Sequence, residues 1–137
     1  MSENLDLMLR AYEHFGRTGE LYFERFSPDF VWDMSNFGGW PERETYPGID
    51  GARSFLRDWR EAWDELTIEP VEFHDAGDEI VAVMHQVGRS KTSGARAEMR
   101  FAQVWTVRDG QFTRMRMYAD AAEALEAVGL PQGTNTP

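Results

Sequence analysis

The chain of 137 residues contains no cysteine. This absence excludes disulfide bonds, thiolate nucleophiles and sulfur-bound zinc, and it gives no reason to expect an oxidising compartment. No stretch approaches the run of about 20 apolar residues that a membrane-spanning helix needs. The opening segment, MSENLDLMLR, carries acids where a secretory signal has a basic and then an apolar stretch. The sequence therefore predicts a cytoplasmic protein that does not enter a membrane.

Positive charge is scarce. Lysine and arginine total 14 against 24 acidic residues, so the formal net charge is -10. A nucleic-acid-binding face needs clustered lysine and arginine to neutralise phosphates. The sequence therefore predicts no nucleic-acid partner, and the acidity is typical of a well-solvated surface.

Motifs for phosphate binding and covalent catalysis are missing as well. The sequence has no glycine-rich phosphate loop and no G-x-S-x-G, so dinucleotide, nucleotide and acyl-enzyme chemistry have no support. His14, His74 and His85 lack a metal-ligand spacing such as H-x-x-x-H. No metal site and no cofactor are predicted.

What the chain does have is apolar and aromatic material for a core. Hydrophobic residues make up 42% and aromatic residues 13% of a length that suits one domain. No repeat, linker or low-complexity segment divides it. We expect a single domain over residues 1–130, followed by a disordered tail over residues 131–137, PQGTNTP.

The segment Ala95–Asp120 predicts a long β-hairpin. Asp109 and Gly110 supply the positive φ that a tight turn needs, and both flanks are rich in residues that suit a pleated sheet. Each arm has about nine to twelve residues, which is longer than an average strand. Strands of this length curl, and the concave side of a curled sheet leaves a hollow that helices must close.

Apolar residues three and four positions apart predict three helices before this hairpin. The first begins at Ser2 or Asn4 and ends at Gly16, and the second runs from Thr18 to Pro28. The third begins at Asp50 and carries two tryptophans on its inward stripe. Between the second and third helices we expect a strand at Phe30–Met34 and then an irregular loop at Ser35–Ile49, long enough to act as a lid.

Two more strands precede the hairpin, at Thr67–Asp75 and Glu79–Arg89, and Pro70 confines the first of them to a sheet edge or a bulge. A short helix at Ala121–Val128 ends the domain. This order predicts an α+β fold in which a strongly curved, mostly antiparallel sheet wraps around three N-terminal helices and encloses one apolar pocket.

Asp120 has two competing explanations. With Glu123 it forms the pattern D-A-A-E, which is typical of a helix N-cap. Alternatively, a carboxylate at the mouth of an apolar hollow has a raised pKa and acts as an acid or base near neutral pH. Counting by twos places Arg116 and Tyr118 on its face of the strand, whereas apolar patterning alone favours Met115 and Met117 as the buried face.

Other side chains of interest also have a structural and a functional interpretation. His85 lies within an apolar strand, either as a hydrogen-bonded core residue or as a proton carrier facing Asp120. Gln103 is the one polar member of an apolar face and either makes a structural bond or binds a ligand. Four tryptophans serve either as core filler or as the lining of a pocket; they are Trp32, Trp59, Trp63 and Trp105.

Several short motifs then resemble those of one family. They are YPGIDG at 46–51, RSKTSG at 89–94, VWTVRDG at 104–110, and YAD at 118–120 followed by EALEAVGL at 123–130. Over nearly its whole length the chain resembles the SnoaL-like family. That family belongs to the superfamily with the cone-shaped α+β barrel of nuclear transport factor 2 and ketosteroid isomerase.

The resemblance implies a single deep apolar pocket, a homodimer formed by sheet faces, and acid-base chemistry without a cofactor, of the isomerase, cyclase or hydrolase type. On this basis we expect Asp120 as general base and His85 as partner acid, acting on an apolar or aromatic carbonyl compound. Gln103 stands where many relatives carry an aspartate, which weakens a two-carboxylate mechanism. The expected substrate-binding residues are Trp32, Tyr46, Trp59, Trp63, Gln103, Trp105, Arg116 and Tyr118.

Two alternatives stay open beside an enzyme. The first is a binding or carrier module whose aromatic pocket holds an apolar ligand without chemistry. The second is a structural dimerisation module whose pocket is filled by its own side chains. Fold alone does not decide among them.

Overall fold

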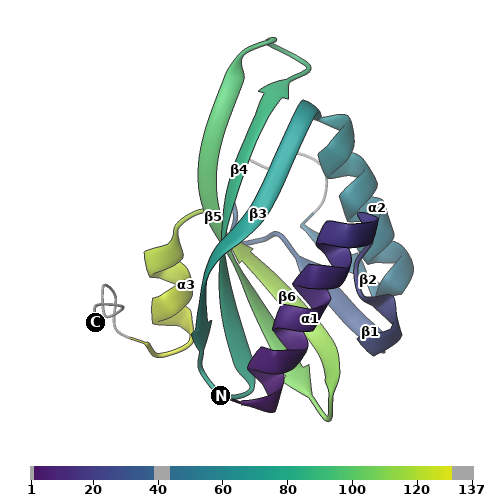
Figure 1. The fold of residues 1–137 in the computed structure, drawn as a ribbon, viewed down its shortest axis with the longest axis vertical. Helices are drawn as coiled ribbons and strands as arrows, with labels where there is room; N and C mark the ends of the chain where they lie inside the picture. The colour runs from purple at the N-terminus through teal and green to yellow at the C-terminus, as the bar shows by residue number, and fades with distance from the viewer. Residues whose placement is uncertain (1, 39–43, 131–137) are drawn as a thin grey trace.

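A computed structural model describes residues 2–38 and 44–130 (Figure 1). The predicted tail, 131–137, lies outside the described residues. The helices in this part of the chain are α1 (Glu3–Thr18), the short 3-10 helix η1 (Phe23–Arg25), α2 (Gly48–Glu61) and α3 (Ala121–Ala127). The strands are β1 (Phe26–Asp33), β2 (Thr45–Pro47), β3 (Trp63–Asp75), β4 (Glu79–Ser90), β5 (Arg96–Arg108) and β6 (Gln111–Tyr118).

The strands form one six-stranded sheet in the order β2-β1-β6-β5-β4-β3. Strands β1 and β6 run parallel, and every other neighbouring pair is antiparallel. The sheet is twisted and curved without closing on itself, and α1 and α2 lie against one of its faces (Figure 1). This confirms the predicted α+β fold with a cone-like, mostly antiparallel sheet.

The predicted hairpin is confirmed as β5 and β6. Its turn places Asp109 at φ 51° and Gly110 at φ 75°, the pair of positive values that a two-residue hairpin turn with right-handed twist needs. β3 is the edge strand that Pro70 predicted, and its pairing with β4 shifts register between Pro70 and Glu72.

Strict alternation along the strands separates two cores. Inward side chains such as Phe101 and Trp105 pack with α1 and α2. Outward side chains such as Val81, Ala102 and Val104 pack with α3, which lies on the opposite face of the sheet. The inward face therefore holds the large aromatic core, and the outward face holds a smaller cluster.

The predicted boundaries of the first two helices need correction. α1 passes through Gly16 and ends with Gly19 in the left-handed conformation, at φ 77°. The expected second helix is only the single turn η1, because the chain becomes extended at Phe26 and β1 continues through Pro28. Within residues 2–38 and 44–130, two N-terminal α-helices therefore lie against the sheet, in place of the three expected.

The segment expected as a loop also contains structure. Its described C-terminal part forms β2, which pairs with β1 so that Tyr46 lies opposite Trp32. α2 follows directly with Pro47 as its N-cap and ends before Trp63, which begins β3 and does not belong to the helix. Among the residues described, no helix is long and apolar enough to cross a membrane.

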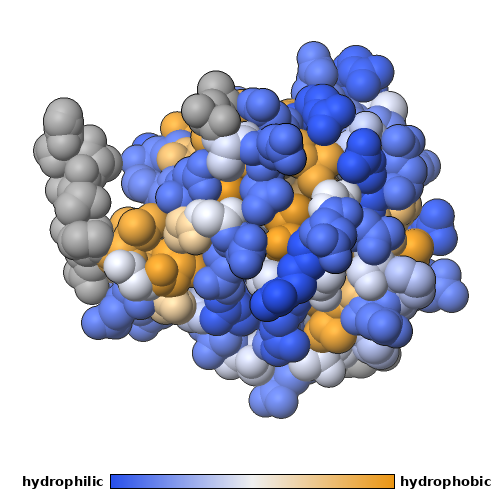
Figure 2. Space-filling view, turned by 90° about the horizontal axis from the view of Figure 1, so that it is seen from below, coloured by the Kyte–Doolittle hydropathy of each residue, from blue (hydrophilic) through white to orange (hydrophobic). Residues whose placement is uncertain are grey.

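Figure 2 shows the molecule from below. The surface there is mostly hydrophilic, with apolar patches at the left, where α3 lies, and further ones in the centre and at the lower right. Within the parts of the chain that the structure places, the only large apolar side chains that are well exposed are Leu9 and Val71. The acidic composition thus corresponds to a solvated outer surface around an apolar interior.

Candidate functional site

A cavity lies between the inward face of the sheet and the two helices α1 and α2. Its free volume is about 50 Å³, and its lining is almost wholly apolar and aromatic. This volume holds only a few water molecules. Lining residues include Tyr12, Trp32, Trp59, Phe101, Gln103 and Trp105.

Three polar groups meet in the lining. The Tyr12 hydroxyl donates to Gln103 Oε1, and Trp105 Nε1 donates to the Tyr12 oxygen over 3.0 Å. Trp105 Nε1 also lies 3.3 Å from Gln103 Oε1. α1 supplies Tyr12 and β5 supplies the other two at alternating positions, so the helix and the strand are joined at this point. We call Tyr12, Gln103 and Trp105 the polar triad.

The triad presents neutral groups. Burial raises the pKa of the Tyr12 phenol far above its usual range, against a smaller lowering by the hydrogen bond from Trp105. Tyr12 is therefore protonated throughout the physiological range and serves as a hydrogen-bond donor. It is not a base.

Trp32 has a different feature. Its ring stacks on Phe55 with centroids 4.5 Å apart and meets Trp105 edge-on at 5.7 Å. The residue is 1% exposed, and among the described residues its Nε1 is the one buried side-chain polar atom without a hydrogen-bond partner. An unpaired buried donor costs about 1–3 kcal/mol, so an acceptor oxygen that entered the cavity would gain a hydrogen bond there.

Trp59 lines the cavity but has its donor occupied. Its Nε1 donates to Gln86 Oε1 over 2.7 Å, and Gln86 is itself 1% exposed. Trp63 packs on Trp59 with centroids 6.3 Å apart and lies outside the lining. A side chain at Gly88 would approach Trp63 to 3.1 Å, so this glycine leaves the room that the indole needs.

Tyr46 also lies outside the cavity lining, although it is fully buried. Its hydroxyl donates to Asp58 Oδ2 over 3.1 Å, and its ring meets Phe55 edge-on. Of the eight residues expected to bind substrate, the structure places four in the lining. These are Trp32, Trp59, Gln103 and Trp105.

Asp120 lies on the outer side of the sheet. It is exposed and caps α3, accepting a hydrogen bond from the Ala122 amide at 2.9 Å. Tyr118 belongs to the outer cluster under α3, while Met115 and Met117 belong to the inner core. Asp120 therefore acts as the N-cap of α3, and Met115 and Met117 form the buried face of β6, as the apolar pattern indicates. Asp120 does not line the cavity.

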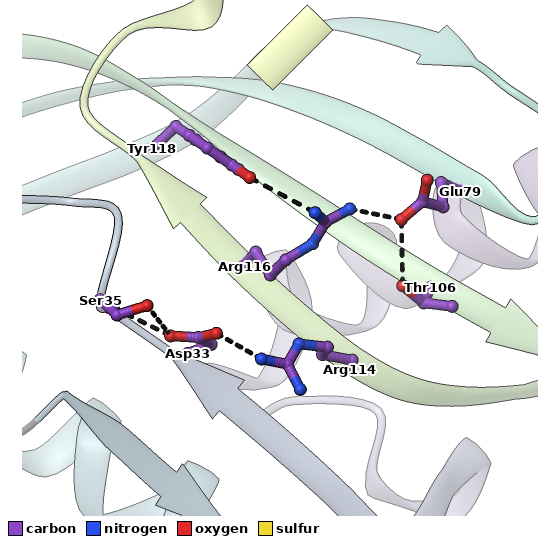
Figure 3. A network of polar contacts seen from close by, with 7 residues as sticks. All are labelled: Asp33, Ser35, Glu79, Thr106, Arg114, Arg116 and Tyr118. Atoms are coloured by element: carbon purple, nitrogen blue, oxygen red, sulfur yellow. Dashed lines mark hydrogen bonds and ion pairs between the residues drawn. The ribbon is translucent and has the colours of Figure 1, made fainter. Parts of the chain in front are cut away.

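Arg116 shares this outer face (Figure 3). It forms an ion pair with Glu79 and donates to the Tyr118 oxygen at 3.4 Å. Thr106 also donates to Glu79, at 3.4 Å. Arg116 and Tyr118 therefore belong to a polar network that spans β4, β5 and β6, and neither of them lines the cavity.

His85 is on the outer face of β4. Its Nε2 lies 2.5 Å from Glu98 Oε2, and its side chain is 25% exposed. The hydrogen bond from His85, followed by its charge, lowers the pKa of Glu98. His85 is thus the partner of a surface carboxylate, and it does not line the cavity.

Sequence reasoning did not single out Asp33 or Tyr12. Asp33 has a side chain only 6% exposed, accepts from the Ser35 hydroxyl and amide at 2.7 and 2.9 Å, and pairs with Arg114 (Figure 3). Burial, the largest influence, raises the pKa of Asp33, but Ser35 and Arg114 together outweigh it and the pKa is lowered. The signal for Asp33 was a lone acid within the apolar run FVWDM.

The sequence profile described as the SnoaL-like domain matches residues 10–115. The chain belongs to the SnoaL-like domain family. A comparison with curated proteins found no match.

Solved structures share the fold over most of the chain. TerC, co-crystallised with polyporic acid, is 27% identical with a TM-score of 0.71, covering 93% of this chain and 98% of its own. An NTF2-like protein from Burkholderia thailandensis is 24% identical with a TM-score of 0.74, covering 93% and 98%. A protein with a ketosteroid isomerase-like fold from Catenulispora acidiphila, in complex with trimethylamine, is 17% identical with a TM-score of 0.59, covering 79% of both chains.

Proposed function

We propose that this SnoaL-like domain binds a small apolar or aromatic molecule that carries an oxygen atom, and that the cavity beneath the sheet is its site. The observation that carries the proposal is the coincidence of an apolar aromatic lining with the polar triad and the unpaired Trp32 Nε1. Binding sites for small molecules combine mostly apolar walls with a few placed polar groups in this way. TerC, which shares the fold, was co-crystallised with polyporic acid.

The polar groups suggest how such a ligand is held. A carbonyl or hydroxyl oxygen of the ligand accepts from Trp32 Nε1 and competes for the Tyr12 hydroxyl, which now donates to Gln103. The rings of Trp32 and Phe55, already stacked, offer an aromatic wall. Ligand-free protein has only about 50 Å³ of cavity, so binding requires side chains to move apart.

The side chains that move are those at the rim. Phe15, Leu21 and Tyr22 line the cavity and are only half-buried, whereas Trp32 and Trp105 are almost fully buried. The rim residues lie at the C-terminal end of α1 and in the segment that leads to η1. Ligand entry at this end leaves the sheet unchanged.

Binding has more support here than acid-base catalysis. Among the described residues that line the cavity there is no carboxylate and no histidine, and Tyr12 is held in its neutral form. A neutral phenol stabilises a developing oxyanion, but abstraction of a proton also needs a base. The isomerase, cyclase or hydrolase roles proposed for Asp120 and His85 therefore stay predictions without a cavity contact to support them.

The proposal is tested with prodan, a fluorescent aromatic ketone. Titration of prodan into the protein is expected to shift its emission to shorter wavelength and to quench tryptophan fluorescence by energy transfer, because Trp32, Trp59 and Trp105 line the cavity. Trp32→Phe keeps the aromatic wall and removes the unpaired donor, so affinity for the ketone should fall about tenfold.

Two controls accompany this titration. Prodan in which the ketone is replaced by an alkyl group should bind wild type and Trp32→Phe equally well. Asp120→Asn should leave the affinity unchanged, because Asp120 caps α3 on the far face of the sheet. If no aromatic probe binds, or if Asp120→Asn abolishes binding while Trp32→Phe does not, the proposed site is wrong.

We also propose that the chain forms a homodimer through the outer face of the sheet. α3 covers only part of that face, and Val87 lies beyond the cluster beneath α3, half-buried between Thr67 and Glu98 on the neighbouring strands. Sedimentation equilibrium should give twice the 15.8 kDa of one chain, and Val87→Asp should lower it to one chain. A wild-type protein that sediments as a monomer at micromolar concentration contradicts this proposal. The predicted cytoplasmic location stays a prediction.

A further inference from the structure

A second concave region adjoins the cavity on the helical side of the molecule. It is a groove of about 380 Å³ between the end of α1, η1 and α2, and its volume is larger than that of the cavity. Its lining includes four of the chain's 14 basic residues, against two acids, Glu20 and Glu61. The basic residues are Arg53, Arg57, Arg60 and Lys91.

This concentration of positive charge runs against the rest of the chain, whose formal net charge is -10. Arg53, Arg57 and Arg60 recur at spacings of four and three, so they share one face of α2. Lys91 joins them from the loop after β4. The groove therefore carries a local positive potential that attracts anions.

Among the described residues, the groove's own acids form no ion pair with these cations, and Arg53 pairs with Asp50, outside the groove lining, over 3.7 Å. Within the described residues, Arg57, Arg60 and Lys91 form no ion pair, although Glu20 and Glu61 line the same groove. Arg57 makes only a 3.4 Å contact with Ser54 Oγ. Its guanidinium is thus free to bind a ligand.

Two of the cations are held in place. Arg60 donates to the Gly19 carbonyl and lies over the Phe15 ring, 6.0 Å from its centroid. Arg53 lies 4.4 Å from the centroid of the Phe23 ring. Guanidinium groups positioned against aromatic rings are oriented in advance, which suits them to carboxylate or phosphate.

The groove and the cavity share a boundary. Leu56 lines both of them. Phe15, beneath Arg60, lines the cavity, and Phe23, beneath Arg53, packs edge-on against the cavity residue Phe26 at 5.2 Å. The basic groove thus lies beside the half-buried rim at which a ligand would enter.

We propose that the groove binds the anionic group of the same ligand whose apolar body occupies the cavity. The ligand class is then an amphipathic acid, with an aromatic or aliphatic body and a carboxylate, sulfonate or phosphate at one end. This inference rests on the proposed function of the cavity. Arg57 and Lys91 are the residues that contact the anion, and Leu56 lies between its two parts.

The test uses two probes with the same apolar skeleton. Anilinonaphthalene sulfonate carries an anionic group, and N-phenylnaphthylamine does not. Both brighten in apolar surroundings, so their dissociation constants are measured by fluorescence on the whole protein. We expect the sulfonate to bind about fivefold more tightly, and the advantage to disappear as salt rises from about 0.05 M to about 0.5 M.

The variant Arg57→Gln/Lys91→Gln removes the two cations that make the fewest contacts with the fold. This variant should lower the affinity for anilinonaphthalene sulfonate about fivefold and leave the affinity for N-phenylnaphthylamine unchanged. The matched control is Arg96→Gln/Arg108→Gln, which lowers the net charge equally at exposed positions on β5. This control should leave the affinities for both probes unchanged, and circular dichroism should show that both variants are folded.

The outcomes separate the two proposals. If neither probe binds, the proposed cavity function is wrong, and the groove proposal fails with it. In a second outcome, the neutral probe binds and Trp32→Ala lowers its affinity, but Arg57→Gln/Lys91→Gln leaves the affinity for the sulfonate unchanged. The cavity proposal then stands and the groove proposal is overturned. If the control variant weakens the sulfonate equally, general charge and not this groove accounts for the preference, which also overturns it.

Discussion

The two faces of the sheet are built from the same strands and differ in what covers them. Along β5, Phe101, Gln103 and Trp105 point inward, while Ala102 and Val104 point outward. Small outward side chains let α3 pack closely on the sheet. Large inward rings hold α1 and α2 away from the sheet and leave the cavity between them. Side-chain size on alternating positions thus decides which face has space for a ligand.

Charge differs between the faces as strongly as size. The outer face carries the ion pairs Arg116–Glu79 and His85–Glu98, together with the partly exposed Arg114. On the inner face, the described residues that line the cavity carry only neutral polar groups, which include the polar triad. The cavity is therefore suited to binding by apolar contact and neutral hydrogen bonds, whereas the ion pairs named above lie on the outer face.

The largest expected difference between the faces is in stability. Trp105→Ala removes an indole that contacts Phe26, Phe30, Trp32 and Phe112, so the free energy of unfolding should fall by about 3–5 kcal/mol. Val104 directly precedes Trp105 and points outward. Val104→Ala should lower the free energy of unfolding by about 2 kcal/mol. Urea denaturation followed by circular dichroism measures both losses. Equal losses would show that the inner face does not contribute more to stability than the outer face.

Within the inner face, the triad predicts an order of effects. Gln103→Leu removes the acceptor of the Tyr12 hydroxyl, and leaving a buried donor unpaired should cost about 1–3 kcal/mol. Tyr12→Phe should cost less, about 0.5–1.5 kcal/mol, because Gln103 Oε1 still accepts from Trp105 Nε1. The same denaturation experiment checks this order, and a larger loss for Tyr12→Phe would contradict the assigned donors and acceptors.

The ion pair of Asp33 with Arg114 predicts a contribution to stability that depends on pH. Asp33→Asn should lower the free energy of unfolding by about 1–2 kcal/mol at pH 7, a modest figure because the Arg114 end of the pair is partly exposed. The pKa of Asp33 is lower in the folded protein than in the unfolded chain. Its contribution is therefore fully present above the unfolded pKa of about 3.9 and is lost as pH falls through the folded pKa.

The measurement is a set of urea denaturation curves between about pH 7 and about pH 3, for wild type and Asp33→Asn. The difference in stability between the two proteins should narrow toward the acid end, below about pH 3.9. A difference that stays constant across this range would mean that ionisation of Asp33 does not stabilise the fold.

The smallest expected effect concerns Asp120. Asp120→Ala removes the N-cap of α3 and should cost about 1 kcal/mol, whereas Asp120→Asn keeps an acceptor and should cost less. Neither variant should change the affinity for prodan. Thermal denaturation and probe titration measure the two effects. A loss of binding without a loss of stability would show that Asp120 takes part in ligand binding.

Most of the fold followed from local patterns in the sequence. The Asp109–Gly110 turn, the alternation along β4 and β5 and the edge position of Pro70 each depend on neighbouring residues, and the structure confirms them. The boundary between the 3-10 turn and β1 did not follow, because the parallel pairing of β1 with β6 joins segments far apart in the chain.

The site was predicted only in part for a similar reason. Trp32, Trp59, Gln103 and Trp105 could be found because large side chains on one strand or helix face point to a common interior. Tyr12 could not be distinguished from an ordinary helix core residue, since its partners on β5 come more than ninety residues later. For Asp120 the two strand faces both looked plausible, and the apolar pattern of Met115 and Met117 was the better guide.

The most direct test of the central claim is a nuclear magnetic resonance titration of prodan, in which the indole N–H signals are assigned by tryptophan-to-phenylalanine variants. We expect the Trp32 and Trp105 Nε1 signals to shift with ligand, while the imidazole signals of His85 stay in place. Shifts confined to His85 and the α3 amides, with Trp32 and Trp105 unmoved, would place the ligand on the outer face and contradict it.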